Sequence, residues 1–434
     1  MYFVTLFSVA LATTSAFALD PVDVRDDHVV QVDSLPITAN FKLPDGVTLP
    51  EHDRARFKAL LARGGDQQLA TREMKNVKLK NTAVHYTMSV GVGSPATYCK
   101  FSMDQSEMHL AEIGFCGVDD LLLDSGSGYT WLGAGKKYVK TKSSFKQKET
   151  FYVNYQSGSA VGQNYKDNFT LSPSLSISNK SFGVASSVNG VEGFDGILGL
   201  GPNTLSQVLE VGDSKKSAPT ILDALFAQKK IPKNMFGLSF APTKKAGTVD
   251  GQVTFGGVNS AKYTGKLNWV DVTKKEPFNM YWGYEQSIKY GNQTIQKTGA
   301  GVVDTGTTLI YITPNAFKIY SDSLPGSKMD EKIHLLEIPK ESVGKMKSLF
   351  FNIGGVSYEF TPNAQLWPRS LNAAIGGKAD SYYSVISAIS DLEADTGSSF
   401  VNGYAFLQRF YTAYDQSKHR IGFATTPSTY ANVN

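Results

Sequence analysis

Short apolar runs and alternating apolar and polar positions recur along the chain from about residue 86 onward. Residues 86–92 alternate ahead of the turn 93–95, and the apolar run 121–123 is expected to form the strand that pairs with them. Residues 151–159 predict an aromatic-rich strand that enters a Gly/Ser hairpin tip. Similar patterns predict strands at 194–202, 235–240, 252–255, 282–290, 349–352, 358–360, 410–414 and 420–424.

Helical spacing is rare in this sequence. Residues 51–63 and 220–229 have apolar positions at helical intervals, and Thr313-Pro314 provides an N-cap and a first-turn proline for a further helix. Residues 1–80 lack the strand pattern and are charged over most of their length after the first 18. The pattern therefore predicts a mostly β protein with a different N-terminal segment.

Two of the predicted strands end in the same kind of turn. The run 121–131 brings Asp124 into a Ser-Gly-Ser turn, and the run 301–310 brings Asp304 into a Thr-Gly-Thr turn. Glycine permits a tight turn, and the hydroxyls and amides beside it can orient a carboxylate. A single Asp-Thr-Gly is usually only a turn, but two behind matching apolar runs indicate one site built by two similar halves.

Two carboxylates held close together cannot both ionise easily, so they share a proton. One can then activate a water as a base while the other donates a proton to a carbonyl oxygen. This arrangement predicts acid-dependent hydrolysis that needs no metal, no cofactor and no covalent intermediate.

Composition narrows the class of protein. The 434 residues include 40 Gly, 21 Tyr and 25 Phe, with 19% charged residues and a net charge of +4. These values are typical of a β-rich extracellular protein. No dense Lys/Arg tract is present, which argues against a nucleic-acid partner. The length is suited to two lobes plus processing segments.

The N-terminal region predicts secretion. Residues 1–18 form an apolar run followed by an Ala-Phe-Ala cleavage site, which is typical of a signal peptide and too short for a membrane anchor. We therefore expect a secreted protein, with a vacuolar location as the alternative, and no membrane anchor. Residues 19–80 are expected to be a propeptide, the alternative being a disordered arm. Three sequons are candidate glycosylation sites, at Asn168, Asn179 and Asn292.

The segment 99–119 interrupts the first hairpin and contains both cysteines, Cys99 and Cys116. Cys99-Lys100-Phe101 can be encoded with an intron donor sequence, and Val118-Asp119 with an acceptor. Removing the roughly 60 nucleotides between these two sequences keeps the reading frame. The spliced chain then has a new Tyr between Tyr98 and Asp120. We therefore hypothesise a retained intron, with a genuine surface loop or a disulfide-closed loop as the alternatives.

The paired Asp motifs and the flap-like hairpin resemble the pepsin-like aspartic proteases, over about residues 86–424. The likeness is greatest to the secreted fungal polyporopepsin type. It implies an all-β, bilobal fold of two pseudo-symmetric barrel-like lobes with a shared central sheet and a flap. The lobes would span 81–257 and 258–434. The resemblance also implies a monomer that cleaves polypeptide substrates, binds pepstatin-type inhibitors and is made with its own propeptide as an inhibitor.

The resemblance assigns roles residue by residue. Asp124 and Asp304 match the catalytic pair. Ser125, Gly126, Ser127, Thr305, Gly306 and Thr307 match the residues that hold them, with Ser127 and Thr307 bonding the outer carboxylate oxygens. The residues expected to contact substrate or form the flap are Tyr155, Ser157, Gly158, Trp131, Leu122, Ile197 and Thr308. Gly199 and Gly403 match the glycines beneath the two motifs.

Some positions depart from the family pattern. Ser125 replaces the usual Thr but keeps the hydroxyl, and Gln156 follows the flap tyrosine in place of Gly. Ser157 lacks the Asp that helps some fungal members accept Lys, so a hydrophobic or aromatic preference is expected. Asn402 precedes Gly403 where an apolar residue is usual.

Basic residues of the propeptide are expected to cover the cleft, and the candidates for this contact are Arg72, Lys75, Lys78 and Lys80. Two other functions remain open at this point. A catalytically silent pepsin-like binding protein would normally lack an Asp or the flap tyrosine, and a glycosidase would use the two Asp residues as its carboxylate pair.

Overall fold

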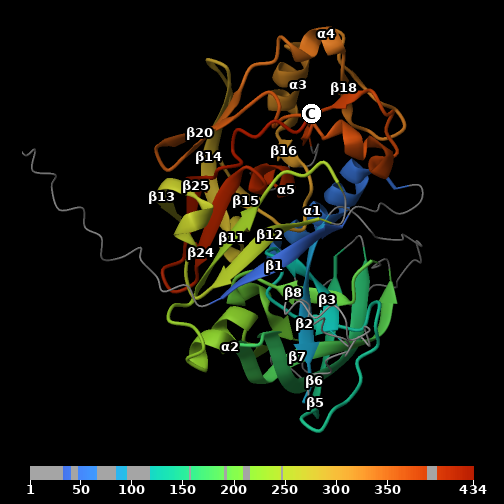
Figure 1. The fold of residues 1–434 in the computed structure, drawn as a ribbon, viewed down its shortest axis with the longest axis vertical. Helices are drawn as coiled ribbons and strands as arrows, with labels where there is room; N and C mark the ends of the chain where they lie inside the picture. Colours follow the sequence, from blue (N-terminus) through green and yellow to red (C-terminus); the bar gives the residue numbers. More distant parts are fainter. Residues whose placement is uncertain are drawn as a thin grey trace, which may run out of the picture.

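A computed structural model describes residues 33–40, 47–65, 85–94, 118–155, 158–189, 193–208, 216–245, 248–388 and 398–434. The architecture is the expected all-β bilobal one, with two large sheets and few helices (Figure 1). Residues 1–18, which are expected to be a signal peptide, lie outside the described residues. So do the four propeptide candidates Arg72, Lys75, Lys78 and Lys80 and the predicted flap residues Gln156 and Ser157. So does most of the 99–119 segment, of which only the backbone of Val118 and Asp119 is described.

The larger sheet has 13 strands and joins the two halves of the molecule. Its central pairing between the halves is antiparallel, with Phe236 of β11 opposite Tyr414 of β24. In spatial order, its strands are β13 (Thr264–Asp271), β25 (Arg420–Thr425), β24 (Phe410–Asp415), β11 (Met235–Phe240), β12 (Val249–Phe255), β1 (Asp33–Asn40), β2 (His85–Val92), β3 (Val118–Asp124), β8 (Gly196–Gly199), β4 (Trp131–Leu132), β7 (Leu175–Asn189), β6 (Ser159–Ser172) and β5 (Phe145–Asn154).

The second sheet belongs to the C-terminal half. Its seven strands, in spatial order, are β20 (Val356–Phe360), β19 (Leu349–Ile353), β14 (Gly283–Tyr290), β15 (Gln293–Val303), β23 (Ser398–Asn402), β16 (Ile310–Ile312) and β22 (Ile386–Ala388). Two small sheets complete the set, β17 (Lys328–Met329) with β18 (Leu336–Ile338) and β21 (Tyr382–Tyr383), and β9 (Gln207–Val208) with β10 (Lys216–Ser217).

The α-helices are α1 (Leu49–Gly65), α2 (Ile221–Ala227), α3 (Pro314–Asp322), α4 (Lys340–Val343) and α5 (Tyr404–Leu407). Two of them begin as the sequence predicts. Thr220 caps α2 by accepting a hydrogen bond from the Asp223 amide, and Thr313 caps α3 by accepting one from the Ala316 amide. No helix of the described residues is long and apolar enough to cross a membrane.

Two elements that precede residue 80 are built into the fold. Strand β1 lies between β12 and β2 in the large sheet, with Leu35 and Ile37 buried in the core. Helix α1 contributes Phe57 and Leu60 to the same core. In Figure 1 both elements, drawn in blue, lie between the cyan-to-green half and the orange-to-red half. The N-terminal segment is therefore not an unstructured arm over these residues.

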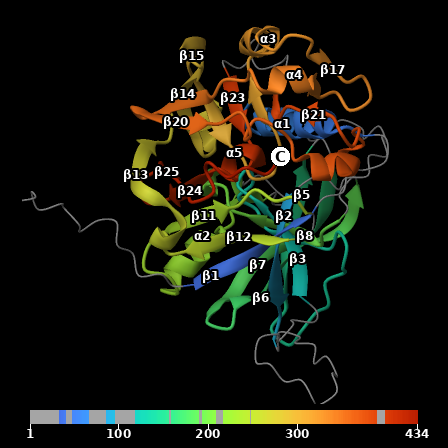
Figure 2. The same ribbon diagram turned by 45° about the horizontal axis from the view of Figure 1, so that its top comes forward.

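The first hairpin forms as predicted from 86–92 and 121–123. β2 pairs with β3 in antiparallel register, with Met88 opposite Leu121 and Gly91 opposite Val118. This pairing carries the chain directly to Asp124 at the end of β3. Figure 2 shows the strands around β3 gathered in one half, away from β14, β20 and β23.

Candidate active site

The two Asp loops occupy equivalent places in the two sheets. β3 ends at Asp124 and runs parallel to β8, while β15 ends one residue before Asp304 and runs parallel to β23. Both aspartates are buried, with exposed fractions of 0% and 1%. The Gly126 amide donates to Asp124 Oδ1 at 2.8 Å, and the Gly306 amide donates to Asp304 Oδ1 at 3.3 Å. Each turn thus orients its own carboxylate.

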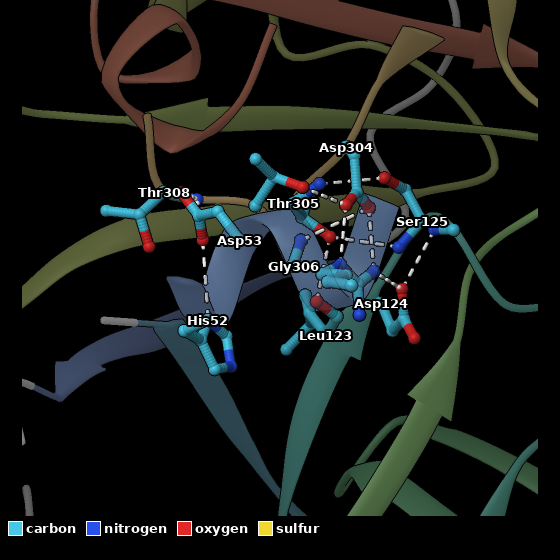
Figure 3. Close-up of polar contacts among 12 residues, drawn as sticks. His52, Asp53, Leu123, Asp124, Ser125, Asp304, Thr305, Gly306 and Thr308 are labelled. Atoms are coloured by element: carbon cyan, nitrogen blue, oxygen red, sulfur yellow. Dashed lines mark hydrogen bonds and ion pairs between the residues drawn. The ribbon is translucent and has the colours of Figure 1, made fainter. Parts of the chain in front are cut away.

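The neighbouring hydroxyl residues tie the loops to one another (Figure 3). The Ser125 amide donates to Thr305 Oγ1 at 2.9 Å, and the Thr305 amide donates to Ser125 Oγ at 3.0 Å. Thr305 Oγ1 also donates to the Leu123 carbonyl at 2.8 Å. The shorter Ser125 side chain therefore retains the reciprocal bond that a Thr hydroxyl would make.

Glycines beneath the loops permit a close approach between backbones. A Cβ at Gly199 would lie 2.7 Å from the Ser127 carbonyl oxygen, and one at Gly403 would lie 2.4 Å from the Leu309 carbonyl oxygen. Both distances are shorter than van der Waals contact, so no larger residue fits without moving the loop. The preceding Asn402 is fully buried and donates to Tyr284 Oη at 2.6 Å and to Gln286 Oε1 at 2.9 Å.

The outer carboxylate oxygens differ between the loops. Thr307 Oγ1 donates to Asp304 Oδ2 at 2.6 Å, as the resemblance implies. Ser127 Oγ instead donates to the Tyr129 carbonyl at 3.5 Å. Asp124 Oδ2 is buried and has no hydrogen-bond partner among the described residues. The expected bond from Ser127 to Asp124 is therefore not made in this structure.

Helix α1 brings Arg56 between the two carboxylates. Arg56 Nη2 lies 2.5 Å from Asp124 Oδ1, while Nε donates to Asp304 Oδ2 at 2.6 Å and Nη2 donates to Asp304 Oδ1 at 2.8 Å. The side chain is buried at 7% exposure. A Cβ on Gly306 would lie within 2.2 Å of Arg56 Nη2, so the guanidinium is packed directly on the turn.

The charges at this contact are mutually stabilised. Burial opposes the charged form of Arg56, but the carboxylates of Asp124 and Asp304 raise its pKa well above the ordinary value. Burial also acts to raise the pKa of Asp304, yet the Arg56 charge and its hydrogen bonds dominate and lower it. Arg56, Asp124 and Asp304 therefore form a compensated ion cluster.

A second side chain of α1 enters the same region. The Asp53 carboxylate is fully buried and accepts hydrogen bonds from the Thr308 and Leu309 amides and from the Tyr311 hydroxyl. Further along the helix, the Tyr281 hydroxyl donates to the Leu60 carbonyl. Helix α1 is thus attached to the C-terminal half at several points.

The hairpin formed by β5 and β6 is the predicted flap. Tyr155 lies at its tip, where its amide donates to the Gly158 carbonyl at 2.7 Å. Its hydroxyl accepts a hydrogen bond from Trp131 Nε1 at 2.8 Å. These two residues belong to a separate apolar cluster of Leu122, Tyr129, Trp131, Phe151, Tyr155, Ala160, Phe194, Ile197 and Ala218. Leu122 and Ile197, which are expected to contact substrate, are therefore brought together with Tyr155 of the predicted flap.

The sequons lie on the surface of both halves. Asn292 is exposed in the turn between β14 and β15, and Asn179 is exposed within strand β7. Asn168 is half-buried, and its side-chain oxygen accepts from the Asn179 amide at 3.1 Å. Among the described residues no group of three or more His, Cys, Asp or Glu side chains could hold a metal ion.

Sequence reasoning missed the residue that contacts both aspartates. Helix 51–63 was predicted, but the basic residues expected in the cleft were those nearer residue 80. Asp53, Arg56, Phe57 and Leu60 share one helical face, and the structure shows that this face combines buried charges with apolar residues. Solvated helices seldom have such a face.

The fold and this paired-carboxylate site define a pepsin-like aspartic protease. The family model described as "Asp: Eukaryotic aspartyl protease" matches residues 85–426, and the chain belongs to this family of peptide-bond hydrolases. The chain is 42% identical to polyporopepsin of Irpex lacteus over 362 residues, which is 83% of this chain and 99% of the relative.

Other comparisons agree with this assignment. The crystal structure of the aspartic proteinase from Irpex lacteus matches with a TM-score of 0.72 at 42% identity, covering 81% of this chain and 96% of that one. Cathepsin D of Clupea harengus is 28% identical over 70% of this chain and 76% of the relative. The protein is therefore an aspartic-type endopeptidase.

Proposed function

We propose that the full chain is the zymogen of a secreted aspartic endopeptidase, held inactive by α1 and converted at acidic pH. The observation that supports this most strongly is the Arg56 guanidinium, which binds both Asp124 and Asp304. A water and a scissile carbonyl need the same carboxylate oxygens. Peptide hydrolysis therefore requires that Arg56 leave.

Acid is the expected trigger because protonation of Asp304 weakens its contact with Arg56. With Arg56 bound, the pKa of Asp304 is lower than in a free carboxyl, chiefly because the guanidinium charge outweighs the burial that acts to raise it. The bound state is favoured above the ordinary Asp pKa and is progressively lost as pH falls through the lowered value. Acidification therefore releases α1, whereas neutral pH retains it.

Once α1 has left, Asp124 and Asp304 are expected to share one proton. The ionised member accepts a proton from water as it attacks, and the protonated member donates to the substrate carbonyl. The flap residue Tyr155 covers the bound peptide. The apolar cluster around Leu122 and Ile197 favours a hydrophobic or aromatic residue at the cleaved bond.

Secretion is proposed from residues 1–18, with the vacuole as the alternative destination. Exposed Asn179 and Asn292 are the more accessible glycosylation candidates. Asn168 is less accessible, since its side chain already bonds the Asn179 backbone. The mature enzyme is proposed to be a monomer that binds polypeptides and pepstatin-type inhibitors.

The segment 99–119 is proposed to be a retained intron, and the pairing of β2 with β3 is compatible with a shorter hairpin. Without the insertion, Tyr98 would take the place of Val118 opposite Gly91, and residues 92–97 would make the connection. Peptide mapping of the native protein tests this: a spliced peptide joining Tyr98, the new Tyr and Asp120 is expected. A peptide from within 100–118 would refute the intron.

The function is tested by acidifying the purified native precursor, the same protein whose peptides are mapped. We expect no peptide cleavage at neutral pH and, after acidification, a new N-terminus downstream of α1 together with cleavage blocked by a pepstatin-type inhibitor. If acid-treated protein is folded but does not cleave peptides, the catalytically silent binding function would be favoured instead.

A further inference from the structure

The Asp53 carboxylate is bound by a set of donors that belongs to the C-terminal half. Its exposed fraction is 0%. The Thr308 amide lies 3.1 Å from each carboxylate oxygen, and the Leu309 amide lies 2.9 Å from Oδ2. The Tyr311 hydroxyl donates to Oδ2 at 3.2 Å. Three convergent donors at these distances make a carboxylate-binding site, occupied here by the chain's own aspartate.

These donors are held by the protein scaffold and not by α1. The carbonyls of Thr308 and Leu309 accept hydrogen bonds from the Ala405 and Gly403 amides, at 2.9 and 3.1 Å. Tyr311 lies in β16, which is paired with β22 and β23. The donor geometry is therefore expected to persist when α1 leaves the cleft. His52, whose Nδ1 lies 3.4 Å from Asp53 Oδ1, belongs to α1 and would leave with it.

The donor set lies immediately beside the catalytic loop. Thr307, which bonds Asp304 Oδ2, directly precedes Thr308 in the chain. On α1, Asp53 and Arg56 are three residues apart and therefore lie on one helical face. Figure 3 shows Asp53 against Thr308 on one side of the paired loops. A peptide that lies across the two aspartates would pass these donors.

We propose that the Thr308 amide, the Leu309 amide and the Tyr311 hydroxyl form a subsite of the mature enzyme that binds an acidic side chain of the substrate. This inference rests on the proposed peptidase function and adds a specificity to it. Departure of α1 exposes three convergent donors that the Asp53 carboxylate had occupied. A substrate Asp or Glu supplies the same carboxylate chemistry that Asp53 supplies before activation.

The test uses acid-activated enzyme and a reference peptide that has one cleaved bond. The positions that flank this bond on both sides are Ala in the reference peptide. Asp, Asn and Ala are placed at each flanking position in turn, and kcat/KM is measured about one unit above the ordinary Asp pKa of about 3.9. At one position we expect Asp to exceed isosteric Asn by about tenfold, because hydrogen bonds to an ionised carboxylate are stronger than those to a neutral amide oxygen. Asp and Asn equal at every position, with the reference peptide still cleaved, would overturn the subsite alone.

A variant separates recognition by this subsite from general charge effects. In Tyr311→Phe, the Asp-to-Asn ratio is expected to fall by about threefold, since one donor of the three is lost. The ratio within one enzyme is independent of any general loss of activity. The matched control is Tyr358→Phe, which removes a buried hydroxyl that donates to the Phe423 carbonyl elsewhere, and it should retain the ratio. An unchanged ratio in Tyr311→Phe would contradict the assignment, whereas failure of wild type to cleave any peptide would reject the proposed function itself.

Discussion

The two Asp loops are alike in sequence and backbone but not in how their carboxylates are held. Asp304 receives bonds from Thr307, from Gly306 and from two nitrogens of Arg56. Asp124 receives one from Gly126 and one from Arg56, and its Oδ2 has no partner among the described residues. The guanidinium and the loop hydroxyl therefore favour the ionised form of Asp304, whose pKa they lower.

The residues that pair with the strands leading into the two loops also differ in polarity. Leu198, opposite Leu123, is buried in the apolar core, whereas the equivalent Asn402, opposite Val303, bonds Tyr284 and Gln286. The first loop rests on packing and the second on a polar network. Pseudo-symmetry of the chain thus fixes where the carboxylates lie, while the local side chains decide how many hydrogen bonds each carboxylate accepts.

The largest expected effect comes from removing either carboxylate of the pair. Asp304→Asn and Asp124→Asn should each lower kcat by about 10⁴-fold after activation, because the acid and the base act as one unit. The double variant should lose little more than either single one. Initial rates with a peptide substrate measure this, and thermal unfolding checks that the variants fold. Substantial cleavage by either single variant would reject the dyad.

Arg56→Ala is the next largest change, since it leaves two buried carboxylates without a counter-charge. The contact between α1 and the cleft should weaken by about 3–5 kcal/mol, which exceeds a hundredfold change in occupancy. A pepstatin-type probe should then bind the full chain at neutral pH. Arg56→Lys is the matched control, because it keeps the charge but loses the forked geometry, and its effect should be intermediate. If Arg56→Ala excludes the probe as well as wild type does, other contacts keep α1 in place.

The loop hydroxyls test the asymmetry directly. Thr307→Ala removes a charged hydrogen bond worth about 1.5–3 kcal/mol, so kcat/KM should fall tens of fold. The pKa of Asp304 should rise, because the lost bond lowered it, and the acid limb of the pH–rate profile should move to higher pH. Ser127→Ala removes only a long bond to the Tyr129 carbonyl and should cost less than about threefold. Equal losses would mean that Ser127 turns to Asp124 in the mature enzyme.

Much of this site could be predicted from local sequence. The turns at Asp124 and Asp304 follow from an apolar strand and a Gly, and those elements form within a few residues of the aspartates. The link from Trp131 to Tyr155 required the family resemblance, because nothing local relates two residues 24 positions apart. Strand β1 was not predicted, although Leu35 and Ile37 alternate in it.

Arg56 and Asp53 show where sequence reasoning ended. A charged residue on a short helix is usually solvated, and a buried one is recognised only once its partners are known. Those partners lie 248 and 255 residues away, at Asp304 and Thr308. Neither spacing nor charge could indicate which of the basic residues before position 80 would reach the carboxylates.

The smallest effect expected on catalysis is that of making the second loop resemble the first. Asn402→Leu restores the apolar residue found at Leu198 but leaves the Tyr284 hydroxyl and Gln286 without their Asn402 partner. The free energy of unfolding should fall by about 1–3 kcal/mol, because a buried polar group loses its bond. The backbone pairing of residue 402 with Val303 does not depend on the side chain, so kcat should change by no more than a few fold. A triple variant that combines Asn402→Leu with Tyr284→Phe and Gln286→Leu should recover stability. All three polar partners are then replaced, so none is left without its bond. A large loss of kcat in the stable triple variant would instead show that the polar network orients Asp304.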